Sequence, residues 1–199
     1  MRMKSLVISL STGLLALTVQ ATCMAQAPAA VNETYGLPAQ YSATAYGQAG
    51  RVAGKSFGLT IFVTDLTDDA TVQALEAALR DKGQDGLVSA LGKIKDKGRV
   101  APTGSVGTGF RFVRIRPTKD GGQHIVLVTD RPISLPELFN STRSTDYKIG
   151  IVVLDVDKDG KGTGSFAPLC KVKFNKKDQL EIENYGQKPF RLGNVYRQK

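Results

Sequence analysis

The stretch YKIGIVVLDVDKDGKGTGSF, residues 147–166, decides how this chain folds. Its first half is apolar at both odd and even positions, which is typical of a strand that is buried on both faces. Asp159 and Gly160 then form a dipeptide that favours a two-residue hairpin turn. The stretch therefore predicts a central β-strand that turns directly into an antiparallel partner, with Val153 opposite Phe166.

The same stretch also contains the opening of a calcium loop. Asp155, Asp157 and Asp159 fall at alternate positions and Gly160 follows, which matches the first half of an EF-hand loop. An EF-hand loop ends with a bidentate glutamate at its twelfth position, but that position is Phe166 here, and the flanks are predicted strands. The sequence therefore excludes an EF-hand and leaves two interpretations: an acidic hairpin turn, which we favour, or a calcium site formed by the three aspartates.

Two further hairpins follow from the same kind of pattern. Residues 109–130 turn at the Asp-Gly dipeptide at 120–121, which pairs Val113 with Val128 and lets Arg111 face Asp130. Residues 169–185 turn at a three-residue loop, 176–178. That turn puts apolar residues on one face and lysine–glutamate pairs on the other, in these pairs: Val172 with Ile182, Phe174 with Leu180, Lys171 with Glu183, and Lys173 with Glu181.

Helical periodicity precedes most of these strands. Residues 55–65 alternate as a strand does, and residues 67–83 and 85–98 then repeat apolar residues at the spacing of amphipathic helices. Gly83 can end the first helix in a left-handed conformation. The sum predicts an α+β fold, a mostly antiparallel sheet with two consecutive N-terminal helices packed on one face.

The first fifty residues have a different composition. Residues 1–25 combine Arg2 and Lys4 with an apolar run and small residues, as a secretory signal peptide does. Residues 26–50 are rich in Ala, Gly, Gln and Pro, which predicts a flexible tether with a short extended piece at its end. We therefore expect a single α+β domain at residues 51–199, exported to the periplasm or the extracellular space without a transmembrane anchor after cleavage.

The net charge and the few potentially reactive side chains limit which partners and reactions are plausible. The formal net charge of +9 favours anionic partners. Cys170 is the only cysteine after residue 25 and His124 the only histidine, far apart in sequence, so we interpret Cys170 as a buried apolar residue. The glycine-rich segment 102–110 lacks the lysine of a phosphate-binding loop, which argues against a nucleotide site.

A resemblance to known proteins supports the expectation of export. The stretches GGQHIVLVTDRPISLPELFN (121–140) and GIVVLDVDKDGKGTGSFAPLCKVKFNKK (150–177) resemble sequences of uncharacterised exported bacterial proteins. That group has no established function, so the resemblance implies an envelope or secreted protein and brings no site residues.

We therefore expect an exported, non-enzymatic binding or envelope-associated module with anionic polymers as candidate partners. No catalytic residue or resident cofactor is assigned, and calcium at Asp155, Asp157 and Asp159 is the one metal hypothesis. The alternative is a hydrolase-type enzyme that uses Asp155 and Asp157 with a bound cation. The candidate face for an anionic polymer comprises Lys171, Lys173, Lys176, Lys177, Arg191 and Arg197.

Overall fold

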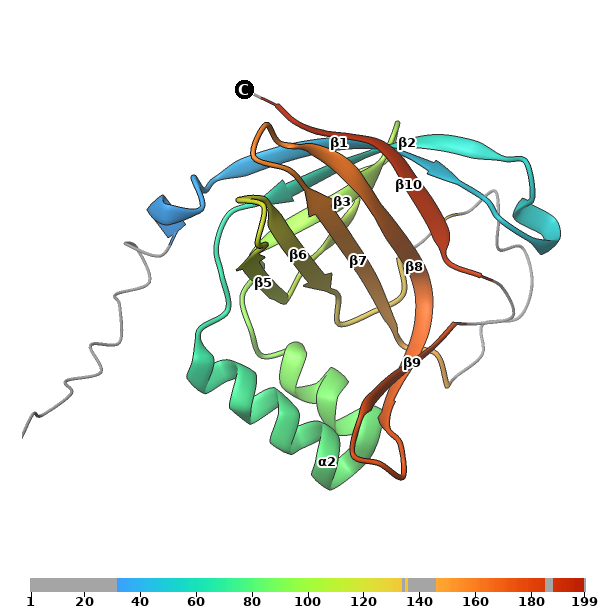
Figure 1. The fold of residues 1–199 in the computed structure, drawn as a ribbon. Coiled ribbons are helices and arrows are strands. Elements are labelled where there is room, and N and C mark those ends of the chain that lie inside the picture. Colours follow the sequence, from blue (N-terminus) through green and yellow to red (C-terminus); the bar gives the residue numbers. More distant parts are fainter. Residues whose placement is uncertain (1–31, 134, 136–145, 185–187, 199) are drawn as a thin grey trace, which may run out of the picture.

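The computed structural model describes residues 32–133, 135, 146–184 and 188–198, in which one antiparallel sheet curls into a half-barrel (Figure 1). The predicted signal peptide, residues 1–25, lies outside the described residues. The strand order is β4-β3-β2-β1-β10-β8-β7-β6-β5, with β9 paired to β8. The strands are β1 (Ala39–Tyr46), β2 (Ser56–Val63), β3 (Gly98–Pro102), β4 (Thr108–Gly109), β5 (Phe112–Pro117), β6 (Gln123–Val128), β7 (Ile149–Val156), β8 (Lys161–Phe174), β9 (Leu180–Asn184) and β10 (Phe190–Arg197).

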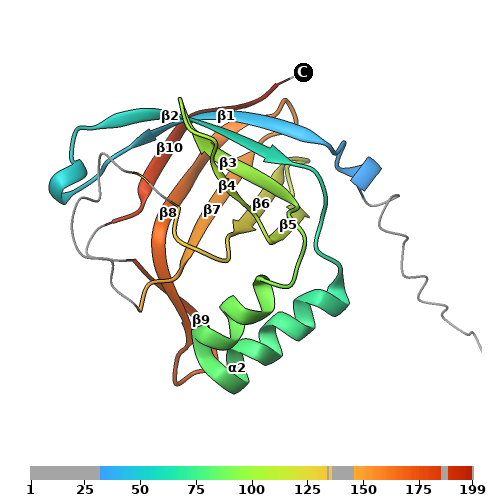
Figure 2. The ribbon, with the colours of Figure 1, turned by 180° about the vertical axis from the view of Figure 1, so that it is seen from behind.

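The predicted α+β fold is wrong, because the sheet makes up most of the structure and the helices do not form a layer of their own. A short 3-10 turn, η1 (Gly50–Val52), joins β1 to β2, and one long helical element, α2 (Asp69–Leu91), replaces the two predicted helices. Gly83 interrupts α2 with φ 60° and ψ −154°, and the element ends at Leu91 instead of continuing to residue 98. Figure 2 shows α2 at one end of the half-barrel, beside β9.

Part of the predicted tether is a central strand. β1 lies within residues 26–50, pairs with both β2 and β10, and buries Tyr41 completely. Its other inward positions are alanines, which are poor strand formers in sequence terms. Small side chains suit this place because Ala45 lies opposite Phe57, whose ring packs edge-to-face on Phe166 and Phe190 inside the half-barrel. The domain therefore begins before Arg51.

The central strand β7 is buried on both faces, as its sequence predicts. Val152, Leu154 and Val156 belong to the core that fills the half-barrel. Ile149 and Ile151 face the other way, into a second core. That second core joins the sheet to α2 through Leu75, Leu79, Leu87 and Leu91.

All three predicted hairpins form, but two of them have a register one residue away from the prediction. Val113 pairs with Leu127, and Val152 pairs with Phe166. The β8–β9 register is confirmed, with Val172 opposite Ile182. Arg111 still reaches Asp130, at 3.1 Å.

All three hairpins share one loop geometry, which explains why two predicted registers are wrong and the β8–β9 register is right. Each hairpin turns through three residues, the last of which has a positive φ: Gly121 (77°), Gly160 (76°) and Asp178 (59°). A type I turn followed by a left-handed residue makes a three-residue loop, and Asp-Gly fits its last two positions as well as it fits a two-residue turn. The lysine before each Asp-Gly dipeptide therefore belongs to the loop and not to the strand.

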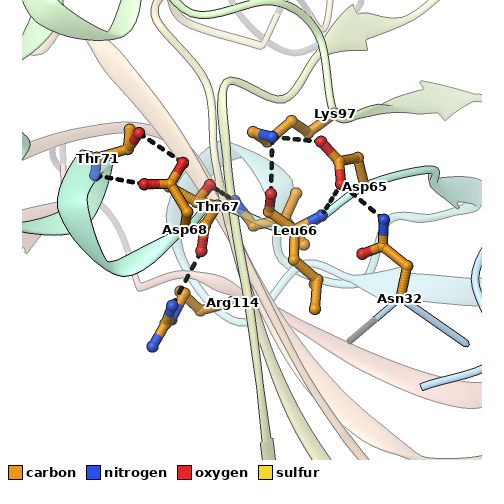
Figure 3. A network of polar contacts seen from close by, with 9 residues as sticks. Asn32, Asp65, Leu66, Thr67, Asp68, Thr71, Lys97 and Arg114 are labelled. Atoms are coloured by element: carbon orange, nitrogen blue, oxygen red, sulfur yellow. Dashed lines mark hydrogen bonds and ion pairs between the residues drawn. The ribbon is translucent and has the colours of Figure 1, made fainter. Parts of the chain in front are cut away.

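The segment between β2 and α2 is fixed by polar contacts (Figure 3), and it also contacts the free edge of β5 at Val113. Thr67 is buried and exchanges two hydrogen bonds with Val113, at 2.9 and 3.0 Å. Asp65 accepts hydrogen bonds from Lys97 (2.5 Å) and from Asn32 (2.8 Å). At Val113 the edge of β5 is therefore not free to pair with another chain.

Within the described residues, we find no helix with the length and apolar character needed to cross a membrane.

Candidate functional site

The acidic loop between β7 and β8 is held together by its own backbone. The Oδ1 atom of Asp157 accepts hydrogen bonds from the backbone nitrogens of Asp159 and Lys161, both at 2.9 Å. In the β8–β9 loop, Asn175 Oδ1 accepts the same two bonds, at 2.9 and 3.0 Å. The uncharged Asn175 side chain thus stabilises the β8–β9 loop in the same way as Asp157 stabilises the acidic loop. The geometry of the acidic loop therefore requires no cation.

The three aspartates of the calcium hypothesis have different surroundings. Asp155 lies on the outward side of β7, where its Oδ1 is 2.5 Å from Nδ1 of His124, its cross-strand partner. Asp157 stabilises the loop, and Asp159 is exposed at its tip. Across the described part of the chain, no group of three or more His, Cys, Asp or Glu side chains is placed to hold a metal ion. Calcium binding here stays a prediction.

The His124–Asp155 pair is a feature that sequence reasoning missed. Both side chains are partly exposed, at 40% and 58%. In a nucleophilic mechanism the histidine contacts the attacking hydroxyl directly. Here Thr163 pairs with Asp155 from the far side, and the other neighbour of His124 is Arg116. The row of cross-strand partners therefore places no hydroxyl next to the imidazole.

Cys170 is inert, as its sequence context indicates. Its side chain is completely buried, and its thiol donates a hydrogen bond to the carbonyl of Ile149 at 3.4 Å. Burial raises the pKa of the Cys170 thiol to about 12, so almost no thiolate is present at neutral pH.

The six basic residues predicted to bind an anionic polymer do not share one face. Lys171, Lys173, Lys176 and Lys177 lie on the β8–β9 hairpin, whereas Arg191 and Arg197 lie on β10. In Figure 1 the hairpin and the end of β10, near the C-terminus, are at opposite ends of the half-barrel, and Arg191 pairs with Tyr46 and Ser165, away from the hairpin. Lys173 also lies 3.5 Å from a carboxylate oxygen of Glu183. Positive charge on the hairpin is therefore largely balanced by nearby carboxylates.

A different surface lacks acidic residues. The adjacent strands β2, β1, β10 and β8 contain no aspartate or glutamate. We call their outward side chains the outer face; all of them are exposed or half-buried. They are Ser56, Thr60, Phe62, Gln40, Ser42, Thr44, Tyr46, Arg191, Asn194, Tyr196, Lys161, Thr163 and Ser165.

Aromatic and basic side chains of the outer face are held in place by each other. The guanidinium of Arg191 lies over the ring of Tyr46, 5.4 Å from its centroid, and Asn194 donates a hydrogen bond to the Tyr46 hydroxyl at 3.2 Å. Arg99 of β3 stacks in the same way on Phe62, at 4.6 Å. Tyr196 is 48% exposed. Figures 1 and 2 show that α2 lies at the other end of the molecule and leaves β1 and β10 uncovered.

A cleft of about 550 Å³ opens at the mouth of the half-barrel. Its walls come from the start of β1, the β5–β6 and β7–β8 loops, and the end of β10. Tyr41, Gln123 and Arg197 line it from the inward side of the sheet, and Asp157 and Asp159 line it from the β7–β8 loop. The cleft is polar, in contrast to the apolar core beneath it.

Burial determines the ionisation state of Tyr41 in the cleft. It raises the pKa of the Tyr41 phenol above its ordinary value, and the positive charge of Arg197 opposes this shift only in part. Tyr41 is therefore neutral at pH 7 and donates its proton to Gln123 Oε1, at 3.4 Å. Arg197 donates one hydrogen bond from its guanidinium to the Gly36 carbonyl, and another from its backbone nitrogen to Gly160, at 2.7 Å.

Comparison with protein-family models finds no matching family, and comparisons with curated proteins and with solved structures find no match either.

Proposed function

We propose that this protein is an exported, non-enzymatic module that binds acidic polysaccharides through the outer face. The observation that supports this function best is the absence of any acidic residue from four adjacent strands in a surface that also carries stacked arginine–aromatic pairs. Export rests on the signal-peptide pattern of residues 1–25.

The outer face offers the three kinds of contact that an acidic sugar chain needs. Lys161 and Arg191 can bind carboxylate or sulfate groups. The half-exposed rings of Tyr46 and Tyr196 provide flat apolar surfaces. The Ser, Thr, Asn and Gln side chains between them can donate and accept hydrogen bonds with hydroxyl groups.

Charge density favours a sugar polymer over a nucleic acid. Duplex DNA carries a phosphate about every 1.7 Å of its axis and is bound by surfaces dense in lysine and arginine. On the outer face basic residues are spread among uncharged hydroxyl and amide groups. That pattern fits a ligand in which anionic groups alternate with hydroxyls.

The alternative function, hydrolysis by Asp155 and Asp157 with a bound cation, has less support. The carboxylate of Asp155 contacts His124 on the outward side of β7, whereas that of Asp157 is bound to the β7–β8 loop backbone. The two carboxylates therefore have separate structural partners.

Charge reversal on the outer face tests the proposed function. Binding of the purified protein to heparin would be measured at several salt concentrations for the Lys161→Glu/Arg191→Glu double variant and for a control, Lys176→Glu/Lys177→Glu, with the same change in net charge. Two exposed attractions become repulsions in the outer-face variant, which should weaken binding roughly tenfold at low salt. An equal loss in both variants, or no loss in either, would contradict the proposal.

A further inference from the structure

We infer that the mouth cleft is a second binding site, specific for a small hydroxylated carboxylate such as a single sugar-acid unit. The site lies on the inward side of the sheet, and the residues that carry the argument, Tyr41, Gln123 and Arg197, are not part of the outer face, although Gln40 borders both. The inference therefore stands or falls independently of polymer binding.

The first argument is the position of Arg197. A β-bulge between Leu192 and Val195, with Asn194 at φ 50°, shifts the alternation of β10 and turns Arg197 inward beside Tyr41. Lysine and arginine are mostly exposed and almost never fully buried unless they are paired, so an inward, half-buried Arg197 is unusual. Among the described residues, no carboxylate lies within 4.0 Å of the Arg197 guanidinium, so it retains positive charge for a ligand.

The second argument is that Arg197 is held in one orientation. The guanidinium packs flat against Gly36, where an added Cβ would lie 2.7 Å from Nη2. The Cβ of Arg197 packs against Gly160, where an added Cβ would lie 2.7 Å away. Only one of its five N–H groups is used by the Gly36 carbonyl. A preorganised guanidinium with free donors suits a carboxylate ligand, which it can bind in a bidentate manner.

The third argument is a set of polar groups that converge on the same space. The Gln123 amide nitrogen has no hydrogen-bond partner in the described part of the chain, while its oxygen accepts from Tyr41. The Asp159 carboxylate at the rim is likewise unpartnered by described side chains and can accept from ligand hydroxyls. The donors of Arg197 and Gln123 together with the acceptor of Asp159 fit a molecule with both a carboxylate and hydroxyl groups.

The size of the cleft agrees with this ligand class. Small-molecule sites typically have volumes of about 300–1,000 Å³, and this cleft is about 550 Å³. Lys158 also lines it, so its formal charges are two basic and two acidic side chains. Of the two cations, Arg197 is the one whose guanidinium is held in place, by the Gly36 carbonyl and by its packing against Gly36, which makes it the better placed group for an anion.

The test is a titration of the full chain, followed by two-dimensional NMR, with three probes: D-galacturonate, D-galactose and acetate. Galacturonate should shift the amide signals of Tyr41, Gln123 and Gln198 and should bind at least tenfold tighter than the other two, because only it has both groups. Equal binding of acetate or galactose, or galacturonate shifts confined to the outer face, would overturn the inference.

Variants make the assignment to Arg197 specific. Arg197→Gln should weaken galacturonate binding about 10- to 100-fold, as expected for loss of a charge-assisted contact. Gln123→Glu keeps an acceptor for Tyr41 but adds a negative charge, and should abolish binding without unfolding the protein. Lys119→Gln, an exposed basic residue of the neighbouring loop, is the matched control and should bind normally. Unchanged binding in Gln123→Glu would refute the site even if Arg197→Gln failed to fold.

The same variants separate this site from the proposed function. Arg197→Gln and Gln123→Glu should retain heparin as well as the unmodified protein does, because neither residue lies on the outer face. Loss of galacturonate binding together with unchanged heparin binding is the expected result.

Discussion

Asp157 is predicted to act as a structural cap of the β7–β8 loop and not as a calcium ligand. Replacing it with alanine removes the acceptor of two backbone hydrogen bonds, from Asp159 and Lys161. Both donors are exposed, so water compensates in part, and the cost should be about 1–2 kcal/mol in the free energy of unfolding. For a domain of this size that corresponds to a fall in Tm of roughly 2–8 °C.

The sharper variant is Asp157→Asn, because Asn175 already performs the same role in the β8–β9 loop. It should cost less than about 0.5 kcal/mol. Both variants would be measured by urea unfolding at pH 7, with and without millimolar calcium. The structural account expects alanine to be destabilising, asparagine to be nearly neutral, and calcium to change nothing.

A ligand that binds only the folded state must stabilise it, so calcium would raise the stability of the unmodified protein if the loop were a metal site. A calcium-dependent rise that both Asp157 variants abolish would refute the structural interpretation. It would also revive the hydrolase alternative.

Three further predictions concern the scaffold. Gly83→Ala should destabilise the protein by about 1–3 kcal/mol in thermal unfolding, because the φ of 60° and ψ of −154° are accessible essentially only to glycine; loss of less than 0.5 kcal/mol would contradict this. Cys170 should not react with a thiol reagent at pH 8 until the protein unfolds, because burial raises its pKa to about 12; rapid modification of the native protein would disprove it. Partial burial raises the pKa of Asp65, but the hydrogen bonds from Lys97 and Asn32 outweigh it and lower the pKa overall. A carboxyl whose folded-state pKa is lowered adds stability above its unfolded-state pKa and loses it as the pH falls, so Asp65→Asn should flatten the acid side of the stability–pH curve, and an unchanged slope would count against the Asp65–Lys97 pair.

The parts of the fold that sequence predicts well are those where a strong pattern has a single solution. β7 is apolar at both parities, which permits only burial on both faces. The β8–β9 register is confirmed because a slip of one residue would bury lysines. Gly83 marks the break in α2 because no other residue type adopts its backbone conformation easily.

The misses have equally specific causes. β1 has the alternation of a strand, but its inward positions are mostly alanine. Alanine is depleted in strands, so the composition of this segment resembles that of a linker. The registers of two hairpins depend on whether a lysine belongs to the strand or to the loop, which Asp-Gly alone does not decide. The missed strand β1 and the prediction of two helices over residues 67–98 together account for the wrong fold class.

The candidate sites depend on features that pattern analysis does not display. The sequence predicts Arg197 on a basic face with the hairpin lysines, whereas the bulge at Asn194 turns it into the mouth cleft. The Gly193–Asn194 dipeptide was the only sequence signal for that bulge. The outer face leaves a signal in the sequence, because the four stretches that form its strands lack acidic residues, but the adjacency of these strands follows only from the sheet order.

The most direct test of the central claim is to map heparin oligosaccharide binding onto the protein by two-dimensional NMR. The account predicts that signal changes will concentrate at the outer face, around Tyr46, Arg191 and Tyr196, with little change on the β8–β9 hairpin. Changes centred on Lys171–Lys177 instead, or spread evenly over every lysine and arginine, would contradict it.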